Sequence, residues 1–439
     1  MSQTGVMGGG VREVVRIGLL GCGNVGAALV RLVDEHADIV AARAGVRIEV
    51  ARVAVRDLGR SREVKLAASV FTDDPAAVVA DPDVDVIVEV MGGVEPARAL
   101  IEAALRAGKP VVTANKELIA RDGPELLGIA ARAGVDLLFE ASVAGGIPLI
   151  RPLRESLAGD RIRRVLGIVN GTTNYILTRM TEDGATFADA LTEAQRLGYA
   201  EADPTADVEG FDAAAKAAII ATIAFGAPVG PGDVFREGLT EVTDDDIRSA
   251  RSLGYVVKLL AVAEEADGDV AVRVHPAMVP VQHPLAAVRD SFNAVFIEAD
   301  AVGELMLYGR GAGGNPTASA VLGDLVDASR NLVAGARGAT IGELVPKPIR
   351  PMADVESPFY VLVEAADRPG VLAAIADQFG RHGVSIKSME QRGIGADARL
   401  VFITHRAREA DLVATLDGLR DVDVVHRVGS VIRVVGEED

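Results

Sequence analysis

The sequence predicts an α/β protein that begins with a doubly wound parallel sheet, continues into a mixed α/β domain and ends in a small βαββαβ module. Three observations carry this prediction. Apolar runs and amphipathic segments alternate up to about residue 138, strands and long helices mix in the middle, and six segments in ferredoxin-like order follow a proline-rich stretch. At 439 residues the chain is long enough for two or three domains, because single cores stop growing at about 250–300 residues.

The first domain is predicted from regular alternation. "VVRIGLL" (14–20) is a continuous apolar run typical of a buried parallel strand, and "GCGNVG" leads from it into a helical pattern. "VRIEVARVAVRD" (46–57) closes a strand–helix–strand unit. Further strands are expected in "VDVIVEVMG" (84–92) and "PVVTA" (110–114), with a helix between them and another from about Lys116. This order predicts helices on both faces of a parallel sheet.

The middle of the chain has a different pattern. Long helical segments are expected over 185–230 and 244–266, and strands over 270–280 and 293–309. "GRGAGGNPTASAVLGDLVDASRN" (309–331) is a glycine loop that feeds a helix, which we expect to pack back onto the first domain. A stretch with four prolines between 346 and 358 then separates this block from the final module.

The final module is predicted from six segments. They are a strand at 359–366, a helix at 369–383, strands at 384–391 and 398–406, a helix at 409–422 and a strand at 428–435. This βαββαβ order is that of a ferredoxin-like module.

Composition excludes several classes of protein. A net charge of −18 argues against nucleic acid or an anionic membrane as a partner, and no apolar run approaches the length that spans a bilayer. The N-terminal residues lack the apolar middle of a secretory signal. Cys22 is the only cysteine, which excludes an internal disulfide. These features predict a cytoplasmic protein.

The glycine loop predicts a dinucleotide site of the Rossmann type. Gly21, Gly23 and Gly26 form G-x-G-x-x-G between the first strand and the first helix, where Asn24 and Val25 open the helix. The three glycines permit a tight turn, close approach of a pyrophosphate and close helix–strand packing, and the helix N-terminus offers N–H donors to phosphate. A plain glycine turn is the alternative.

The choice between NAD and NADP depends on the end of the second strand. An acid there favours a free ribose hydroxyl, whereas an arginine favours a ribose phosphate. Arg56 lies at this tip and favours NADP, but Asp57 is adjacent, and a shift of one residue reverses the preference. A solvated loop would explain the same residues.

Several acids precede a single lysine in "GYAEADPTADVEGFDAAAK" (198–216). Asp212 and Lys216 are four residues apart and share one helix face, where such a pair is usually a surface ion pair. The helix that follows is almost wholly apolar, however, so we expect Lys216 to be partly buried, and burial favours the neutral amine that can accept a proton. Glu201, Asp203 and Asp207 could bind a substrate ammonium nearby. Asp207 could instead cap the helix, and Asp203 could stabilise the turn before Pro204.

The segment 194–216 resembles the signature of the homoserine dehydrogenase family. "TANK" (113–116), "FEASVAGGIPLI" (139–150), "NGTTNYIL" (170–177) and "GRGAGGNPTASAVLGD" (309–324) occur in the family's order, so the resemblance covers essentially the whole chain. "DRPGVLAAIADQFGRHGVSI" (367–386) resembles an ACT regulatory domain, as in the longer bacterial monofunctional enzymes.

The resemblance implies interconversion of L-aspartate 4-semialdehyde and L-homoserine with NAD or NADP, in threonine, methionine and isoleucine biosynthesis. It also implies a domain division. A dinucleotide-binding domain would cover 12–138 with 305–335 packing back onto it, a substrate-binding, catalytic and dimerisation domain 139–304, a linker 336–356 and the ACT domain 357–439. A homodimer or homotetramer is expected.

The resemblance assigns roles to particular residues. Lys216 would transfer the proton, with Lys116 sharing this work or contacting cofactor and substrate, and Asp212 would orient the hydroxyl or the lysine. Glu201, Asp207 and, more weakly, Thr173 would bind the substrate. Gly313 would approach the cofactor through its backbone. An exposed helix-start lysine at 116 and a strand-end turn at 173 are the structural alternatives.

Two further sites are implied by the same resemblance. Glu140, Val143, Gly145 and Ile147 would hold a monovalent cation, usually sodium, through one carboxylate and backbone carbonyls, which suit a hard cation. Asp367, Pro369, Gly370, Val371 and Leu372 would bind an effector, with threonine expected, although some modules of this kind only dimerise.

Two other functions remain open at this point. An oxidoreductase of another small aldehyde or amino acid is compatible with the same fold. A non-catalytic amino-acid sensor is the second, and the presence of Lys116, Asp212 and Lys216 argues against it.

Overall fold

The computed structural model describes residues 13–393 and 398–436. The predicted domains begin one residue before this range and include 394–397 and 437–439, which lie outside the described residues. The chain forms two compact units, one of residues 1–158 with 310–344 and the other of residues 159–309 with 345–439. The division into three domains and a linker remains a prediction.

The first unit is built on a six-stranded sheet in which every pair of neighbours is parallel. Its strands, in spatial order, are β3 (Phe71–Thr72), β2 (Arg47–Ala54), β1 (Val14–Leu20), β4 (Val86–Glu89), β5 (Val111–Thr113) and β6 (Leu137–Leu138). The order reverses direction between β1 and β4, which is the switch point where doubly wound sheets bind ligands.

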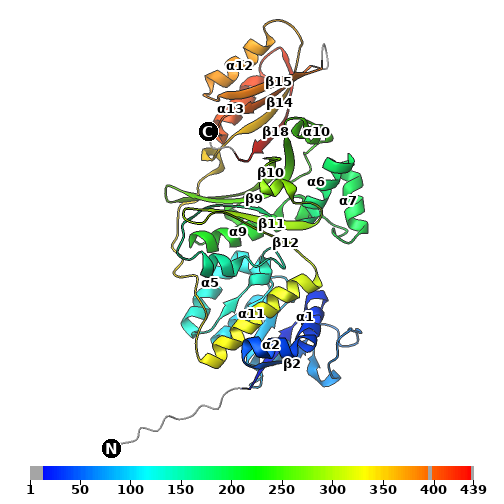
Figure 1. Cartoon of the computed structure of the whole chain (residues 1–439), viewed down its shortest axis with the longest axis vertical. Helices are drawn as coiled ribbons and strands as arrows, with labels where there is room; N and C mark the ends of the chain where they lie inside the picture. The colour runs from blue at the N-terminus through cyan, green and yellow to red at the C-terminus, as the bar shows by residue number, and fades with distance from the viewer. Residues whose placement is uncertain (1–12, 394–397, 437–439) are drawn as a thin grey trace, which may run out of the picture. The chain divides into compact units, whose positions relative to one another are not determined.

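Helices cover both faces of this sheet. They are α1 (Asn24–Glu35), α2 (Ala37–Ala44), α3 (Pro75–Ala80), α4 (Ala97–Arg106), α5 (Lys116–Ala133) and the returning α11 (Gly314–Ala334). Apolar residues of α1 and α11 share one buried core with β1, β2 and β4, and Figure 1 shows α11 in yellow running alongside α1 and α2. The predicted return of the 309–331 segment to this sheet agrees with these contacts.

The second unit is built on a ten-stranded mixed sheet. Its first strands are β12 (Gly303–Arg310), β11 (Phe292–Ala299), β7 (Ile162–Ile168), β9 (Tyr255–Ala266) and β10 (Asp269–Pro280), with β8 (Phe235–Arg236) beside β10. The accompanying helices are α6 (Gly171–Asp183), α7 (Phe187–Arg196), α8 (Thr205–Val208), α9 (Phe211–Phe225) and α10 (Asp244–Ser252). Helix α9 packs against β9, β10 and β7.

The C-terminal module continues the same sheet. It consists of β14 (Phe359–Ala365), α12 (Val371–Arg381), β15 (Ile386–Arg392), β16 (Arg399–Thr404), α13 (Glu409–Arg420) and β18 (Val425–Val434), with β13 (Glu356–Ser357) paired to β17 (Ala407–Arg408) beside it. This is the predicted βαββαβ order. Strand β18 pairs in parallel with β10, which joins Ala277 to Arg433 in register.

One predicted helix is wrong in part. The helix expected over 244–266 ends at Ser252, and residues 255–266 form β9 in the centre of the sheet. A turn at Gly254, whose φ is +83°, separates the two elements. "YVVKLLAVAEEA" is apolar on both faces, and such a run cannot be assigned to helix or strand by periodicity alone.

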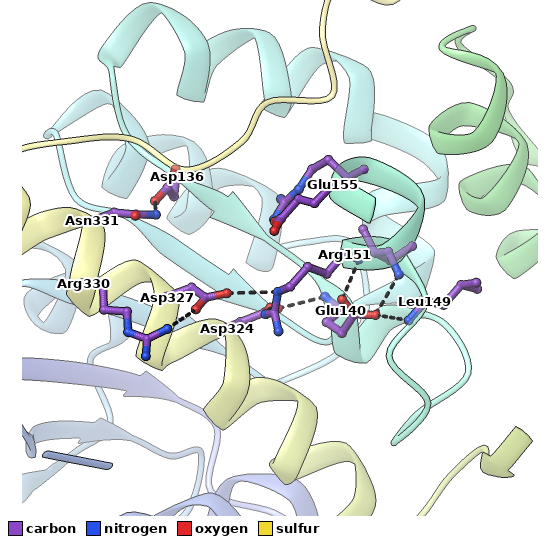
Figure 2. Close-up of polar contacts among 11 residues, drawn as sticks. Asp136, Glu140, Leu149, Arg151, Glu155, Asp324, Asp327, Arg330 and Asn331 are labelled. Carbon is purple, nitrogen blue, oxygen red and sulfur yellow. Dashed lines mark hydrogen bonds and ion pairs between the residues drawn. The ribbon is translucent and has the colours of Figure 1, made fainter. Parts of the chain in front are cut away.

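Buried polar contacts fasten α11 to the segment that follows β6 (Figure 2). The Asp324 carboxylate accepts a hydrogen bond from the Glu140 N–H at 2.8 Å and from the Arg151 guanidinium at 2.8 Å, and Arg151 also pairs with Asp327 at 3.0 Å. One turn further along the helix, Asn331 donates to Asp136 at 2.6 Å. These contacts fix the helix that follows the 311–313 loop.

We predict that Asp324 makes stability depend on pH. Burial, reinforced by the nearby Glu140 charge, raises the pKa of Asp324 to about 7. The unfolded chain releases this proton near pH 4, so between about pH 4 and 7 the folded state holds more protons and loses stability as pH rises. We therefore expect that, in thermal unfolding from pH 4.5 to 8, the melting temperature of Asp324→Asn minus that of the wild type increases with pH up to about 7.

Asp327→Asn on the same helix is the matched control for this comparison. If it produced the same pH dependence, or if the difference between Asp324→Asn and the wild type did not change with pH, the assignment to Asp324 would be wrong.

Candidate active site

The glycine loop of the first unit has the geometry that a dinucleotide requires. Gly21 has φ +100°, and a Cβ placed at Gly26 would lie 2.3 Å from the carbonyl oxygen of Gly21. Gly23 is the N-cap of α1, and a Cβ there would meet no atom within 4 Å. Gly26 is therefore needed for packing of the loop on the helix, whereas the space at Gly23 is open for a ligand.

The loop lines a cavity of about 930 Å³ in the same unit. Asn24 at the start of α1 and Gly313, the N-cap of α11, both face it, so two helix N-termini contribute N–H groups to one cavity. Gly314 packs directly on α1, since a Cβ there would lie 3.2 Å from the Asn24 carbonyl oxygen. Helix N-termini attract phosphate through their unpaired N–H groups and their dipoles.

Guanidinium groups add positive charge to this cavity. Arg31, Arg60, Arg62 and Arg310 line it. Arg56, the residue predicted to select NADP, is exposed and is not among the residues that line it. Arg62 is held in place because it donates to the Arg60 carbonyl at 2.7 Å and to the Asp57 carbonyl at 2.8 Å. The positive charge expected after the second strand is therefore contributed to this cavity by Arg60 and Arg62.

Lys116 is the first residue of α5, directly after the C-terminal end of β5. It is half-buried, and its neighbour Asn115 caps the helix by accepting from the Leu118 N–H at 3.1 Å. At the end of the adjacent β4, the buried Glu89 accepts from the Met91 N–H and from the Thr113 hydroxyl, at 2.8 and 2.6 Å. These contacts order the carboxyl edge of the sheet around Lys116.

The segment predicted to bind a cation is a tight buried turn. A Cβ at Gly145, whose φ is +57°, would lie 2.3 Å from the Gly311 carbonyl oxygen, and Val143 and Ile147 are buried. The Glu140 carboxylate accepts three backbone N–H groups, from residues 149, 150 and 151 at 2.5, 2.7 and 2.8 Å. Both of its oxygens are thus engaged within the protein. Among the described residues, no cluster of three or more acidic, histidine or cysteine side chains could hold a metal ion.

In the second unit, the acids and the lysine of the signature segment meet in one cluster. Lys216 Nζ lies 2.6 Å from Asp212 Oδ2 and donates to the Val169 carbonyl oxygen at 2.7 Å. Only 11% of the Lys216 side chain and 6% of that of Asp212 is exposed, so the pair is not the usual surface ion pair. Because α9 begins at Phe211, both groups lie in its first two turns, at the end of β7.

Asn170 connects this pair to a second acid, and the sequence reasoning missed it. Its Nδ2 donates to Asp207 Oδ1 at 2.6 Å and to Asp212 Oδ2 at 2.8 Å, while its Oδ1 accepts from the Thr173 N–H at 2.9 Å. Asn170 is therefore the N-cap of α6 and the link between two carboxylates. The motif "NGTTNYIL" contains this residue, but an asparagine that follows a strand is equally typical of a plain helix cap.

The other predicted substrate ligands lie differently. Thr173 is buried, and its hydroxyl lies 3.1 Å from both Asn170 oxygens, so it supports the cap. Glu201 is exposed, and its carbonyl oxygen accepts from Gln195 Nε2 at 3.0 Å. Asp203 is also exposed and accepts from the Thr205 N–H at 3.1 Å, which stabilises the turn at Pro204.

A second buried lysine, Lys258 in β9, was also missed. Its Nζ donates to Asn174 Oδ1 at 2.9 Å and to the Val288 carbonyl oxygen at 2.5 Å. Burial lowers the pKa of Lys258 to about 8. Since Asn174 lies on α6, this lysine fixes the helix that Asn170 caps.

The residues predicted to bind an effector surround the start of α12. Gly370 is its N-cap with φ +91°, and Asp367 Oδ1 accepts from Gln391 Nε2 at 3.2 Å. Val371 is buried, whereas Pro369, Gly370 and Leu372 are exposed. The loop thus presents backbone N–H groups at an exposed helix N-terminus.

Comparison with known proteins places these features in one family. Family models match residues 21–140 (homoserine dehydrogenase, NAD binding domain), 148–326 (homoserine dehydrogenase) and 359–424 (ACT domain). The chain is 51% identical to homoserine dehydrogenase of Mycobacterium tuberculosis over 438 residues, which is 97% of this chain and 99% of that relative.

Solved structures agree with the sequence comparison. The crystal structure of a homoserine dehydrogenase from Thiobacillus denitrificans superposes with a TM-score of 0.91 at 42% identity, covering 97% of this chain and 99% of the other. A hyperthermophilic archaeal homoserine dehydrogenase in complex with NADPH matches 72% of this chain and 98% of the other, with a TM-score of 0.62 at 32% identity.

The fold and the family matches are those of an oxidoreductase with a nicotinamide-dinucleotide-binding domain. The family match is specific over nearly the full length. The chain belongs to the homoserine dehydrogenase family and carries a C-terminal ACT domain. The predicted fold class, family and enzyme class are confirmed. In the described part of the chain, no helix is long and apolar enough to cross a membrane.

We predict that replacing the second and the third glycine of the loop, Gly23 and Gly26, impairs the protein in different ways. Gly23→Ala should keep the wild-type melting temperature, because its methyl group meets no protein atom, but it should weaken cofactor binding by about tenfold or more by blocking phosphate approach. Gly26→Ala should lower the melting temperature as well, because of the contact with Gly21. Cofactor titration by fluorescence and thermal unfolding measure the two effects. Tight cofactor binding by Gly23→Ala would contradict the assignment.

Proposed function

We propose that this protein interconverts L-homoserine and L-aspartate 4-semialdehyde, with Lys216 as the group that moves the proton. The observation that carries the proposal is the buried Asp212–Lys216 pair, held by Asn170 and the Val169 carbonyl at the end of β7. The names of the relatives supply homoserine as the alcohol, the resemblance to the family implies the semialdehyde, and the chemistry of the cluster fits an amino-acid alcohol.

In the oxidative direction, the substrate hydroxyl loses its proton to the Lys216 amine as the C–H bond gives up a hydride. The dinucleotide, which the glycine loop would hold, would supply the nicotinamide ring as hydride acceptor. In the reductive direction, Lys216 as an ammonium protonates the developing alkoxide. Asp212 keeps the Lys216 side chain oriented through the 2.6 Å contact, and proton transfer by a positioned side chain typically contributes about 10²–10⁴-fold to the rate.

The acids of the cluster provide recognition of the substrate ammonium. Asp207 and Asp212 converge on one amide, Asn170 Nδ2, and a carboxylate such as that of Asp207 can accept several hydrogen bonds, including those of a cation. We assign Asp207 to the substrate amino group. Glu201 is a weaker candidate, because it is exposed on the loop after α7. Thr173 acts through the cap of α6.

We propose NADP rather than NAD as the preferred cofactor. Support comes from Arg60 and Arg62, which line the cavity from the loop after β2, where a ribose phosphate would lie. The archaeal relative was solved with NADPH. Lys116, at the carboxyl edge of the same sheet, is assigned to contact with the cofactor, and it is the second candidate for the proton.

For a monovalent cation, the residues fit in part. The Glu140 carboxylate is already bound by three N–H groups, so the ligands offered would be main-chain carbonyl oxygens of Glu140, Val143, Gly145 and Ile147. The turn lies against residues 310–312, so an ion there would have a structural role. A homodimer or homotetramer also remains part of the proposal.

The proposal predicts that Lys216→Met lowers kcat for homoserine oxidation by about 10²–10⁴-fold, since the proton acceptor is lost. The Kd for NADPH should stay within about twofold, because the glycine loop is untouched. Initial rates with homoserine and either NAD or NADP, together with cofactor titration, provide the measurements.

Lys347→Met is the matched control for this substitution. Lys347 donates to the Phe225 carbonyl oxygen at the C-terminal end of α9. Replacing Lys347 therefore removes a lysine contact from the same helix but leaves the contacts of Asp212 and Lys216 intact. Unchanged turnover in Lys216→Met would overturn the assignment. If kcat fell only in Lys116→Met, the role of proton acceptor would belong to Lys116.

The ACT domain leads us to propose threonine as a feedback inhibitor that binds at 367–372. The support is an exposed helix N-terminus at Gly370, which offers N–H donors to an amino-acid carboxylate, beside an acid at Asp367 for its ammonium. We predict that threonine lowers the initial rate, and that Asp367→Ala raises the concentration for half-inhibition by about tenfold or more.

The ratio of rates with and without threonine measures this effect, with allothreonine and valine as control ligands. An equal response to all three amino acids, or no response in the wild type, would contradict threonine as the effector.

A further inference from the structure

Asn293, in β11, has a buried side chain that nothing in the described chain satisfies. It is 1% exposed, and neither its Nδ2 nor its Oδ1 has a hydrogen-bond partner among the described residues. The other buried asparagines of this unit are fully used, since Asn170 and Asn174 each make several hydrogen bonds. A buried amide without partners costs stability, so its presence requires an explanation such as a ligand.

The register of the sheet places Asn293 beside the lysine cluster. Strand β11 pairs antiparallel with β7, with Ala294 opposite Ile168, so the next pair along is Asn293 with Val169. The Val169 carbonyl is the oxygen that accepts from Lys216 at 2.7 Å. The two segments also touch directly, because a Cβ at Gly171 would lie 2.7 Å from the carbonyl oxygen of residue 291.

Side-chain alternation decides the face on which Asn293 lies. Ala294 belongs to a core cluster with Leu166 and Ile168 on one face of the sheet. Successive side chains of a strand point to opposite faces, so Asn293 shares the other face with Gly167 and Val169.

Helix α9 packs on that second face, against β7, β9 and β10. Residues directly opposite each other in antiparallel strands point to the same face. Gly167 pairs with Ala261, and Ala261 pairs with Val274, so Val274 lies on the same face as Gly167. The Cγ1 atom of Val274 lies 3.2 Å from the position of a Cβ placed at Gly210, so the N-cap of α9 contacts this face. Asn293 therefore lies on the face of the sheet that carries Asp212 and Lys216, one strand away from the end of β7.

We propose that Asn293 is a further substrate-binding residue, whose Nδ2 donates to the α-carboxylate of the amino-acid substrate. The inference rests on the proposed function. The acids of the cluster can accept from the substrate ammonium but repel its carboxylate, and the amide of Asn170 is already bound to both acids. Asn293 supplies an uncharged donor that does not compete for these acids.

The test uses two analogues of homoserine as competitive inhibitors. One is 4-hydroxybutanoate, which keeps the carboxylate and lacks the ammonium, and the other is 3-aminopropan-1-ol, which keeps the ammonium and lacks the carboxylate. Asn293→Leu should raise the inhibition constant of 4-hydroxybutanoate and the KM for homoserine by about tenfold to a hundredfold, the range for a lost hydrogen bond to a charged group. The inhibition constant of 3-aminopropan-1-ol should change less than about twofold, because the bond in question is absent there.

Two more variants sharpen the test. Asn293→Asp keeps the size of the side chain but places a negative charge opposite the carboxylate, so it should impair homoserine binding more than Asn293→Leu does. Ser329→Ala removes another buried polar group that has no partner among the described residues, in α11 of the other unit, and should leave both inhibition constants unchanged.

Thermal unfolding separates a ligand from a packing role. Since the amide has no partner in the part of the chain that the structure describes, Asn293→Leu should keep or raise the melting temperature of the free protein. A lower melting temperature together with equal weakening of both analogues would overturn the inference while leaving the proposed function intact. Absence of homoserine turnover in the wild type would overturn both the proposed function and the inference about Asn293.

Discussion

The buried pair of Asp212 and Lys216 is the constraint on which the second unit depends. Taking two charges out of water is expensive, and their attraction compensates only when the remaining hydrogen-bonding capacity is also used. Here the amine has the Val169 carbonyl and the carboxylate has the Asn170 amide. The end of β7, the cap of α6 and the start of α9 are therefore held by one set of contacts, and Lys258 secures α6 through Asn174.

In the first unit, the equivalent constraint is close approach of backbone to backbone. Gly26 packs on Gly21, and Gly145 packs on Gly311, at distances that no side chain would allow. The second contact brings the loop before α11 against the turn after β6, and the Asp324 network holds the helix itself. As a result, the N-termini of α1 and α11 face one cavity, although about 290 residues separate them in the chain.

The C-terminal module is connected through its backbone to the sheet that carries the lysine cluster. Strand β18 pairs with β10, β10 with β9, and β9 with β7, which ends at Val169 beside Lys216. The predicted βαββαβ unit is thus hydrogen-bonded into the sheet that carries the lysine cluster. The short β10–β18 ladder and the pairing of residues 348–350 with Val270 are the points at which the module is attached.

The sequence alone determined what depends on local pattern and local chemistry: the parallel strands, the glycine loop, the βαββαβ order and the placement of Asp212 and Lys216 on one face of an apolar helix. Two kinds of feature required the tertiary structure. Residues 255–266 are apolar on both sides, so only pairing with β7 and β10 made them a strand. Asn170 and Asn293 look ordinary in the sequence. Only the folded chain joins Asn170 to Asp207 and Asp212, and only the register of β7 and β11 sets the face of the sheet on which Asn293 lies, because contacts between distant segments leave no periodic signal in the chain.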